Sequence, residues 1–598
     1  MKRWFKYIKP YMLYFILGPV CMIVEVIGEV LMPKFLALII DYGTGETPVE
    51  KAPALIKNIF DLFGGQSPFI IAIMTAMILT AILMMIGGVG GAYFGAKASV
   101  NFAADLREDV FRKVQKFSFA NIDKFSTGSL VTRLTNDVTQ MMNFINMLLR
   151  MCLRAPGMLI GGIIMAVLLS PRLTLTLAIA LPILFGAIML VVRVGFPRFS
   201  KMQERIDGLN STVQESITNV RVVKSFVRED FEIQKFAKSN GELKAAGLRA
   251  TGIMILLSPI MTFCMNATTI AVMWFGGNML IDSTMTTGDL TAFITYITQI
   301  LSSLMMVTMM FIMMSRALAS AKRISEVLDE KIDITDDNVT GENASLTVKK
   351  GDVEFRNVSF RYYKNSEGKV IDNVNLKIDA GKTVGIIGST GSGKTTLVSF
   401  ISRLYDVDEG EVLVDGVNVK DYSLYNLREG VGVVLQKNVL FSGTIEENLR
   451  WGNEDASMEE IRAAAENAQA DGFIMSFADG YGTELEQGGT NVSGGQKQRL
   501  CIARALLKQP KIIIFDDSTS AVDTATEAKI RTAFRTSLKD STKIIIAQRI
   551  SSVIDADQII VLDDGKVTGM GTHAELIANN TEYQEIYYSQ MDKKEATA

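Results

Sequence analysis

The sequence predicts an α-helical membrane domain of six spans, followed by an α/β domain of the P-loop class. Hydrophobic residues make up 48% of the 598 residues, and they crowd into the first 316. Most charged residues follow that point, as in a soluble domain of ordinary size. In this second half, a glycine-rich loop separates a β-rich run from a helical run, which is the context of a phosphate-binding loop.

The composition excludes several other classes of protein. A net charge of −3 argues against a nucleic-acid-binding protein. The four cysteines form no CxxC motif and no Cys/His cluster, so the sequence indicates neither a disulfide framework nor a cysteine-based metal site. The start of the chain, MKRWFKYIKP, is basic and aromatic, and no small-residue cleavage site follows it. This pattern favours a short interfacial helix over a signal peptide.

The membrane domain is predicted from long apolar segments, because a helix needs about 20 apolar residues to cross the hydrocarbon core. Six segments qualify: 11–41, 68–96, 140–170, 173–192, 251–281 and 290–315. The segments 68–96 and 251–281 contain no charged residue and are the clearest spans. The segment 140–170 is less uniform, since Arg150 and Arg154 lie in its first half.

Two connections between the spans, 97–139 and 193–250, are long and rich in charge. Their helical spacing predicts that the spans continue as helices beyond the bilayer, with short turns at 118–124 and near 217–224. The two long loops and the N-terminus are rich in basic residues, which favours the cytoplasm for all three.

The spans also contain clustered glycines and ionisable residues, and both features need an explanation in a membrane helix. Glycines cluster in one span: Gly87, Gly88, Gly90, Gly91 and Gly95. They suit close helix packing and equally suit a kinked or flexible span. Glu25 and Glu29 share one helix face, as do Arg150 and Arg154. Glu25 and Arg154 come to similar depth, which permits an ion-pair ladder, a polar patch in a substrate pathway, or arginines that simply extend to the membrane surface.

The first motif of the second half is the stretch TVGIIGSTGSGKTT, which contains a Walker A loop. Its loop and helix start comprise Gly388, Ser389, Thr390, Gly391, Ser392, Gly393, Lys394, Thr395 and Thr396. The glycines let backbone N–H groups close around phosphate oxygens, and the helix that follows points its positive end at them. Lys394 is expected to reach the β- and γ-phosphates of ATP, and Thr395 is expected to bind Mg²⁺.

Further along, the run KIIIFDD predicts a buried strand that delivers Asp516 to Mg²⁺, as a Walker B motif does. It follows NVSGGQKQRL, in which residues 492–496 resemble the signature motif of ABC transporter ATPases. Six spans joined to one such domain resemble an ABC exporter half-transporter of the multidrug and lipid-flippase type. The resemblance covers nearly the whole chain.

This resemblance implies a transmembrane domain over 1–322, a linker over 323–350 and a nucleotide-binding domain with a helical subdomain over 351–598. The turns at 118–124 and 217–224 resemble the coupling helices that press on nucleotide-binding domains. ATP and Mg²⁺ are the implied cofactors. The implied location is the cell membrane, with the N-terminus and the nucleotide-binding domain in the cytoplasm.

The remaining nucleotide contacts follow from the resemblance, position by position. Tyr362, with Tyr363 as the alternative, resembles the aromatic residue that stacks on adenine. Gln436 resembles the Q-loop residue that touches Mg²⁺ and relays to the membrane domain. The segment 484–489 resembles an altered X-loop, and the segment SAVD, which ends at Asp523, resembles the D-loop.

Two positions depart from the family pattern. In this family, two ATPase domains close head to tail on two nucleotides, and each site combines the Walker motifs of one chain with the signature of the other. Asp517 stands at the position of the catalytic glutamate, and Gln548 stands at that of the switch histidine. The one histidine, His573, falls in GTHAEL, which resembles a structural turn. The chain's own site is therefore expected to hydrolyse ATP slowly or not at all.

The signature is better preserved. Ser493, Gly494, Gly495 and Gln496 are intact, and only the usual leading leucine is replaced, by Val492. The pattern resembles the degenerate half of heterodimeric bacterial ABC exporters, so the expected partner is a second half-transporter. A slow homodimer, an ATP-gated channel or regulatory protein, and an importer on the same fold stay open. The expected cargo is a hydrophobic or amphipathic small molecule, a lipid or a peptide.

Overall fold

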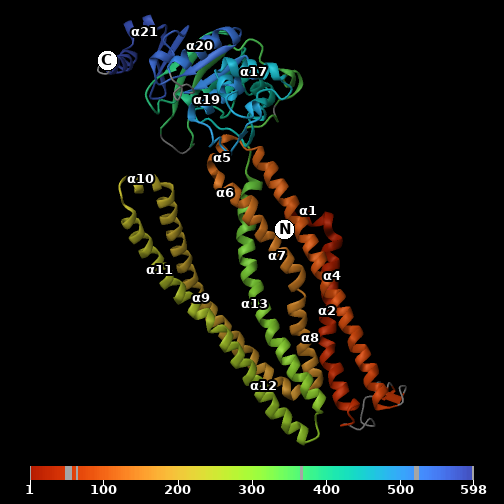
Figure 1. Ribbon diagram of the computed structural model, residues 1–598. Helices are drawn as coiled ribbons and strands as arrows, with labels where there is room; N and C mark the ends of the chain where they lie inside the picture. Colours follow the sequence, from red (N-terminus) through yellow and green to blue (C-terminus); the bar gives the residue numbers. More distant parts are fainter. Residues whose placement is uncertain are drawn as a thin grey trace. The chain divides into compact units, whose positions relative to one another are not determined.

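The computed structural model describes residues 2–46, 57–58, 60–61, 65–337, 339–363, 368–517 and 524–595. The chain divides into two compact units (Figure 1). Unit 1 comprises Met1–Val114 and Gly128–Asp329, and unit 2 comprises Gln115–Thr127 and Glu330–Ala598. Long helices build unit 1, and the strands lie in unit 2.

The helices of unit 1 are α1 (Lys2–Ile8), η1 (Lys9–Tyr11), α2 (Met12–Leu38), η2 (Ile39–Gly43), α4 (Gln66–Gln115), α6 (Thr127–Thr132), η4 (Arg133–Asp137), α7 (Val138–Met151), α8 (Arg154–Leu169), α9 (Pro171–Thr218), α10 (Val220–Ser225), α11 (Glu229–Ile255), α12 (Leu257–Ile281) and α13 (Thr287–Asp329). Within the described residues, six helical stretches are long and apolar enough to cross a membrane. The six predicted spans are confirmed.

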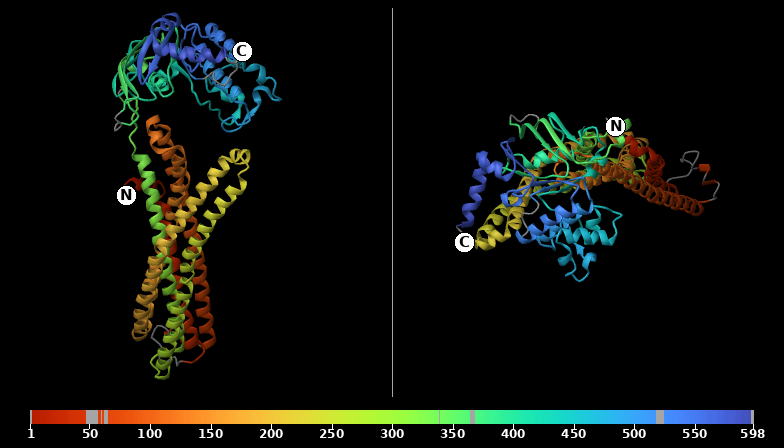
Figure 2. Two further views of the ribbon diagram at one scale, coloured as in Figure 1. Left: turned by 90° about the vertical axis from the view of Figure 1, so that its left-hand side faces the viewer. Right: turned by 90° about the horizontal axis from the view of Figure 1, so that it is seen from above.

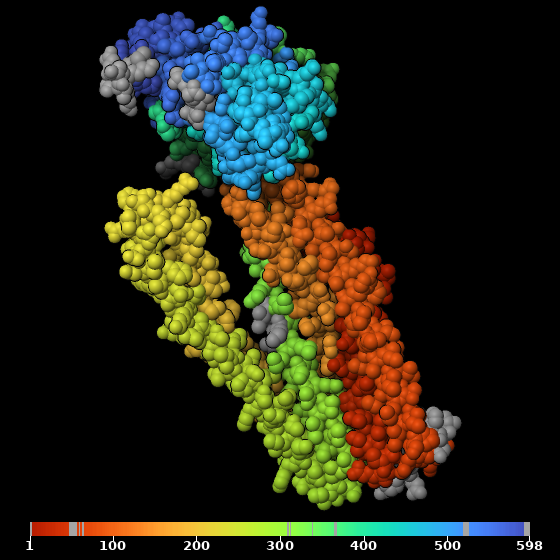
Figure 3. Space-filling model, viewed as in Figure 1, coloured from red at the N-terminus to blue at the C-terminus, as the bar shows by residue number. Residues whose placement is uncertain are grey.

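The helices also continue well past the length that a bilayer requires. The 50 residues of α4 give a helix about 75 Å long at 1.5 Å per residue, whereas the hydrocarbon core is about 30 Å thick. The helices α9 and α11 run side by side and are joined by α10, at the tip of the hairpin (Figures 1 and 2). The space-filling view shows this hairpin diverging from the rest of unit 1 towards α10 (Figure 3).

The glycines of α4 serve close packing rather than a kink. A Cβ atom on Gly87 would lie 2.7 Å from the carbonyl oxygen of Cys21, and one on Gly91 would lie 2.3 Å from Cε of Met22. Both neighbours belong to α2, and α4 runs unbroken through the glycines. Small residues therefore let the two helices approach closely, as they do in other membrane proteins.

The third predicted span, 140–170, is instead interrupted. Helix α7 ends at Met151 and α8 begins at Arg154. Pro156 explains the interruption, because proline has no N–H group to donate to the carbonyl of Cys152, and its ring clashes with that carbonyl. The expected span is confirmed as two helices with a short break between them.

The strands of unit 2 are β1 (Val353–Phe360), β2 (Ile371–Ile378), β3 (Thr383–Ile387), β4 (Glu409–Val414), β5 (Val417–Asn418), β6 (Val431–Val434), β7 (Gly443–Thr444), β8 (Glu484–Leu485), β9 (Ile512–Asp516), β10 (Thr542–Ile546), β11 (Gln558–Asp563) and β12 (Lys566–Gly571). The main sheet has the order β12-β11-β3-β10-β9-β6, and an antiparallel sheet has the order β2-β1-β4-β5. Strands β11, β3, β10, β9 and β6 are parallel.

The helices of unit 2 are α5 (Phe119–Phe125), η5 (Gly341–Ser345), α14 (Lys394–Ser399), α15 (Leu424–Gly430), α16 (Ile445–Arg450), α17 (Met458–Asn467), α18 (Asp471–Ile474), η6 (Gly480–Gly482), α19 (Gly494–Leu507), α20 (Thr524–Ser537), η7 (Ile550–Ser552), α21 (His573–Asn579) and α22 (Thr581–Glu595). Helices α16 and α17 pack on α19 around buried side chains that include Ile461 and Leu500. They form the predicted helical subdomain. The domain boundaries at 322 and 350 stay predictions.

Candidate nucleotide site

Four motifs from distant parts of the sequence converge on one edge of the main sheet. Strands β3, β10, β9 and β6 are neighbours and parallel, so their carboxyl ends meet at the same edge. The Walker A loop follows β3, and Asp516 ends β9. Gln548 and Gln436 each come two residues after their strands, β10 and β6. Ligands of open α/β sheets bind at this edge, which makes it the candidate nucleotide site.

The Walker A loop needs glycine for steric reasons at two positions. The φ of Gly388 is 156°, and a Cβ atom there would lie 1.9 Å from the carbonyl oxygen of Leu562. Gly393 has a φ of 96° and caps α14, in the left-handed region that L-residues avoid. The loop is thereby held so that its N–H groups and the start of α14 can face phosphate oxygens.

Lys394 lies over this loop. Its Nζ atom donates hydrogen bonds to the carbonyl oxygens of Gly388 at 2.9 Å and Ser389 at 2.6 Å. Burial lowers the pKa of Lys394, while the carboxylates of Asp516 and Asp517 act in the opposite direction. A bound polyphosphate would add negative charge here and favour the charged ammonium group.

Thr395 and Asp516 lie together, as the Mg²⁺ prediction requires. The hydroxyl of Thr395 donates to both carboxylate oxygens of Asp516, at 2.9 Å each. Asp516 is only 3% exposed, and burial raises its pKa. A hydroxyl oxygen beside a buried carboxylate fits Mg²⁺, which binds protein oxygens sparingly and takes its other ligands from water and phosphate. These two residues would hold the ion, and Gln436 as a third ligand stays a prediction.

The two departures from the family pattern contact each other. Nε2 of Gln548 donates to Oδ2 of Asp517 at 2.7 Å, and Nε2 of Gln436 reaches the same oxygen at 3.4 Å. Burial raises the pKa of Asp517, and the two amides oppose this shift. Asp517 also has a φ of 47°, a left-handed conformation that is unusual for a residue with a side chain. The carboxylate thus lies between two neutral amides.

The aromatic residues are placed unequally around the Walker A helix. The hydroxyl of Tyr362 is 2.8 Å from Oγ1 of Thr396, and its ring makes an edge contact with Tyr405 at 5.2 Å. Tyr363 is 74% exposed, against 42% for Tyr362. This position favours Tyr362 over Tyr363 as the residue that stacks on adenine.

The signature motif forms the exposed start of α19. The N–H group of Ser493 donates to Oε1 of Gln496 at 2.9 Å, and the N–H group of Gln496 donates to Oγ of Ser493 at 3.3 Å, which completes a capping box. Ser493 and Gly494 are exposed, with Gly495 next to them. Apart from its own helix and its chain neighbours, no described residue has an atom within 4 Å of the place where a Cβ atom on Gly494 would stand. Packing among the described residues therefore gives no reason for this glycine.

Val492 has a different environment. It is buried in the core of the helical subdomain, where it packs with residues such as Leu440 and Leu485. The exchange of the usual leucine for valine is therefore a change inside the core and leaves the exposed face of the motif intact.

Other sequence predictions have simpler outcomes. The D-loop prediction, with Asp523, lies outside the described residues. The predicted X-loop contributes the short strand β8, which pairs with β7.

The one histidine of the chain packs inside unit 2. Nδ1 of His573 is 2.7 Å from the hydroxyl of Tyr583, and the imidazole ring packs against Tyr587, so His573 has the expected structural role.

Sequence reasoning missed one contact of the first coupling turn. This turn is α5, which belongs to unit 2. The hydroxyl of Tyr405 donates to Oδ2 of Asp123 at 2.8 Å, and its ring lies 6.0 Å from that of Phe119. No sequence pattern could have joined Tyr405 to a residue 282 positions away, because the pairing depends on the tertiary fold.

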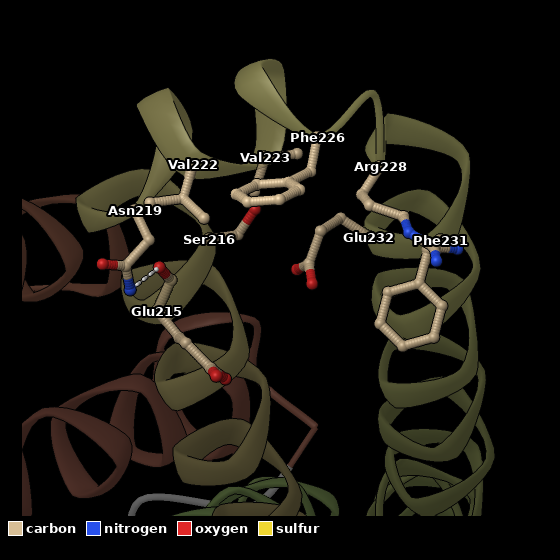
Figure 4. Close-up of a pocket in the computed structure, with 9 residues that line it drawn as sticks. All are labelled: Glu215, Ser216, Asn219, Val222, Val223, Phe226, Arg228, Phe231 and Glu232. Carbon is tan, nitrogen blue, oxygen red and sulfur yellow. Dashed lines mark hydrogen bonds between the residues drawn. The ribbon is translucent and has the colours of Figure 1, made fainter.

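The second coupling turn, α10, stands at the tip of the α9–α11 hairpin. A hollow of about 600 Å³ lies between the helices there (Figure 4). Asn219, Phe226 and Glu232 are among its lining residues, and Nδ2 of Asn219 donates to the carbonyl oxygen of Glu215 at 2.9 Å. Phe226 is 73% exposed and Val227 is 81% exposed. Apolar side chains as exposed as these suit a surface that another domain covers.

Of the alternatives left open for the charged residues of the spans, the structure shows an ion pair between Glu25 and Arg154. Nη1 of Arg154 lies 3.2 Å from Oε1 of Glu25, and Nη2 lies 3.3 Å from Oε1 of Glu29. One arginine of α8 is thus shared by two carboxylates of α2, and the three residues form a cluster.

These features define a class of protein: six membrane spans joined to a single domain whose loops converge to bind ATP. Comparisons with known proteins identify the family to which both of these parts belong. Residues 15–304 match the family model described as "ABC transporter transmembrane region", and residues 371–520 match the model "ABC transporter". The chain therefore belongs to the ABC transporters. It is an exporter-type half-transporter, a multi-pass integral membrane protein that binds ATP and that requires a second half.

Particular relatives support this assignment over the whole length. The chain is 36% identical over 594 residues to "Uncharacterized ABC transporter ATP-binding protein YfiB" of Bacillus subtilis, covering 99% of each protein. It is 36% identical over 589 residues to the corresponding protein Rv1273c of Mycobacterium tuberculosis, covering 98% of this chain and 97% of that one. Among solved structures, it resembles "Structure of a bacterial Atm1-family ABC exporter with ATP bound", with a TM-score of 0.73, 27% identity, and coverage of 95% of this chain and 98% of that one.

Proposed function

We propose that this chain is the degenerate half of a heterodimeric ABC exporter in the cell membrane. The composite site on its own Walker motifs holds ATP and hydrolyses it slowly or not at all. Its signature motif completes the site at which the partner hydrolyses ATP. The cargo is a hydrophobic or amphipathic small molecule, a lipid or a peptide, and the N-terminus and the nucleotide-binding domain face the cytoplasm.

The contact between Gln548 and Asp517 is the observation that carries this proposal. The 2.7 Å hydrogen bond turns the carboxylate of Asp517 towards an amide. An aspartate is also shorter than a glutamate by about 1 Å, and misplacement on that scale costs ~100-fold in rate. An amide stays neutral, so Gln548 offers the γ-phosphate a hydrogen bond but no positive charge. Both changes weaken attack by water at the same site.

Retention of ATP at that site is supported by the parts that remain. The Walker A glycines, Lys394, Thr395 and Asp516 keep the geometry that binds phosphate and Mg²⁺. The protein thus has the residues for binding without the usual residues for cleavage. A retained nucleotide would keep the two nucleotide-binding domains engaged between turnovers, while hydrolysis at the other site resets the transporter.

The signature supports the other half of the proposal. Gly494 lies exposed at the start of α19, and among the described residues only its own helix and chain neighbours lie near the space beside it. A glycine that intrachain packing does not require suits a close approach by a group from outside the chain. In the proposed dimer, that group is the nucleotide bound by the partner.

The proposal is tested by purifying this chain alone and together with a co-expressed half-transporter encoded by the neighbouring gene. We expect a stable complex whose ATPase rate and substrate transport far exceed those of this chain alone. Robust ATPase activity and transport by the chain alone would instead establish a homodimeric exporter. ATP-dependent conductance in a planar bilayer, without accumulation of substrate against a gradient, would establish a channel.

A further inference from the structure

The membrane domain contains a polar cavity that the nucleotide cycle does not explain. Its volume is about 530 Å³, and helices α2, α4, α7, α8 and α13 supply its walls. Glu25, Arg150 and Arg154 line it, together with Asn146 of α7. A cavity lined by several ionisable groups is expensive in a membrane protein and marks a site for a ligand or an ion.

The charged side chains that line this cavity differ in whether they have ion-pair or hydrogen-bond partners. Arg154 is shared between Glu25 and Glu29, at 3.2 and 3.3 Å. Within the described residues, Arg150 makes no ion pair and no hydrogen bond through its side chain. Oε2 of Glu25 and Nε of Arg154 are buried and also lack hydrogen-bond partners there. The cluster thus offers unfilled hydrogen-bonding capacity and one cation without a counter-ion.

Packing holds Arg150 at this place. A Cβ atom on Gly95 would lie 3.3 Å from Cγ of Arg150, so the stem of the arginine rests directly on α4. Oε2 of Glu25 stands equally close to Gly88, seven residues earlier on α4. Seven residues correspond to about 10 Å along a helix, so the carboxylate of Glu25 and the stem of Arg150 lie about 10 Å apart along α4. The Arg150 side chain is therefore not engaged by the Glu25 carboxylate, although it lines the same cavity as Arg154.

The backbone at the cavity is irregular as well. The break between α7 and α8, at Cys152 and Leu153, falls between the two arginines that line the cavity. Interrupted helices occur at membrane depth where the backbone is buried in protein or lines a cavity, and such breaks often form substrate sites. The position of the break is thus a second indication of a binding site.

Methionines supply much of the rest of the wall, alongside Asn143 and Gly88. Met22, Met147, Met151 and Met313 all line the cavity. Methionine side chains are flexible and polarisable, so they accommodate apolar groups of different shape. Beside an arginine without a counter-ion, such a wall fits a molecule with an anionic head and an apolar tail.

We propose that this cavity binds an amphipathic anion, with its phosphate or carboxylate group on Arg150 and its apolar part against the methionines. The inference names the class of cargo and rests on the proposed export function. A membrane phospholipid and a free organic anion share this chemistry. Arg154 serves as a positioning residue, because its charge is committed to the two glutamates.

The test uses two probes with the same tail and opposite head charge, dodecyl phosphate and dodecyltrimethylammonium. Binding to the purified full-length chain in phosphatidylcholine nanodiscs is measured by calorimetry, below the micelle concentration and with empty nanodiscs as the blank. No nucleotide is added, so the result does not depend on the partner or on hydrolysis. We expect saturable binding of dodecyl phosphate at least about tenfold tighter than that of the cation.

Substitutions identify the site. Arg150→Gln should weaken binding of dodecyl phosphate at least about tenfold, and Arg150→Lys should retain most of it, because it keeps the charge. Arg172→Gln removes an exposed arginine at the start of α9, outside this cavity, and should change nothing. Melting temperatures of all the variants show whether they fold. Equal affinity for the two probes, or unchanged affinity in a folded Arg150→Gln variant, would overturn the proposal.

A last arm separates the two sources of anion. Replacing part of the phosphatidylcholine with phosphatidylglycerol should weaken binding of dodecyl phosphate if a membrane lipid occupies the site, because the two then compete. Unchanged binding assigns the site to a free amphipathic anion. Both outcomes support an anion site on Arg150, and they are told apart by the lipid alone.

Discussion

At Gln548 an amide stands where the resemblance to ABC ATPases predicts a histidine, and the effect of this exchange depends on the neighbour that Gln548 contacts. Its 2.7 Å hydrogen bond to Asp517 joins the two substituted positions in one contact. Gln436 reaches the same carboxylate oxygen. Each substitution alone would weaken one catalytic contact, whereas together they pair the shorter carboxylate with a neutral amide of its own chain.

Restoring both residues should therefore restore activity at this site. We expect the double variant Asp517→Glu with Gln548→His to raise hydrolysis at the site at least ~100-fold, because the longer carboxylate and the imidazole regain their positions. The measurement is single-turnover release of phosphate from the assembled transporter, with the partner's own catalytic glutamate replaced by glutamine. Each single variant serves as a control and should recover much less. No increase in the double variant would mean that other features of the site limit hydrolysis.

At the scale of elements, small residues and one proline set the architecture of the membrane domain. Gly87 and Gly91 bring α4 against α2, and Pro156 separates α7 from α8. The charged cluster of Arg154 with Glu25 and Glu29 then joins α8 to α2. Close packing and a break thus occur within the same few helices, and the same helices line the cavity beside Arg150.

The packing role of Gly87 has a direct test. Gly87→Ala should destabilise the membrane domain by about 1–3 kcal/mol, because the new methyl group would meet backbone atoms of α2 that cannot move aside. Gly186→Ala is the matched control, since in the part of the chain that the structure describes no atom outside its own helix lies within 4 Å of its Cβ position in α9. This control should be neutral or slightly stabilising. Equal melting temperatures for the two variants in detergent would show that α2 and α4 do not pack as described.

Much of the fold follows from the sequence, and the reason differs between the two halves. Spans are local features, because length and apolarity decide them, and the six helices were predictable for that reason. The break at Cys152 was missed because the apolar pattern of 140–170 continues through it. The glycine cluster left packing and kinking equally open until Cys21 was placed opposite Gly87.

The site was predictable as a set of residues and not as a set of contacts. Motif spacing identified Lys394, Thr395 and Asp516, which the parallel strands then bring together. Two contacts depend on tertiary geometry that no local sequence pattern encodes. They are the hydrogen bond between Gln548 and Asp517 and the hydrogen bond between Tyr405 and Asp123. Sequence therefore indicated which groups are present, and the structure indicated which of them touch.

At the scale of the whole molecule, the chain is one half of a transporter, and in the proposed dimer its two motif sets would serve different sites. The Walker motifs lie at the edge of the main sheet, whereas the signature lies exposed at the start of α19. Closing two such domains head to tail would give one composite site with Asp517 and Gln548, and another with Ser493 and Gly494. We propose that only the second of these sites drives transport.

The most direct measurement of that claim is the steady-state ATPase rate of the purified heterodimer carrying one substitution in this chain. Asp517→Asn should leave the rate within about twofold of the unsubstituted transporter, because its site contributes little turnover. Ser493→Arg should lower the rate at least about 100-fold, because it removes a contact to the nucleotide that the partner hydrolyses. Loss of activity on Asp517→Asn comparable to that on Ser493→Arg would contradict the account, since both sites would then hydrolyse ATP.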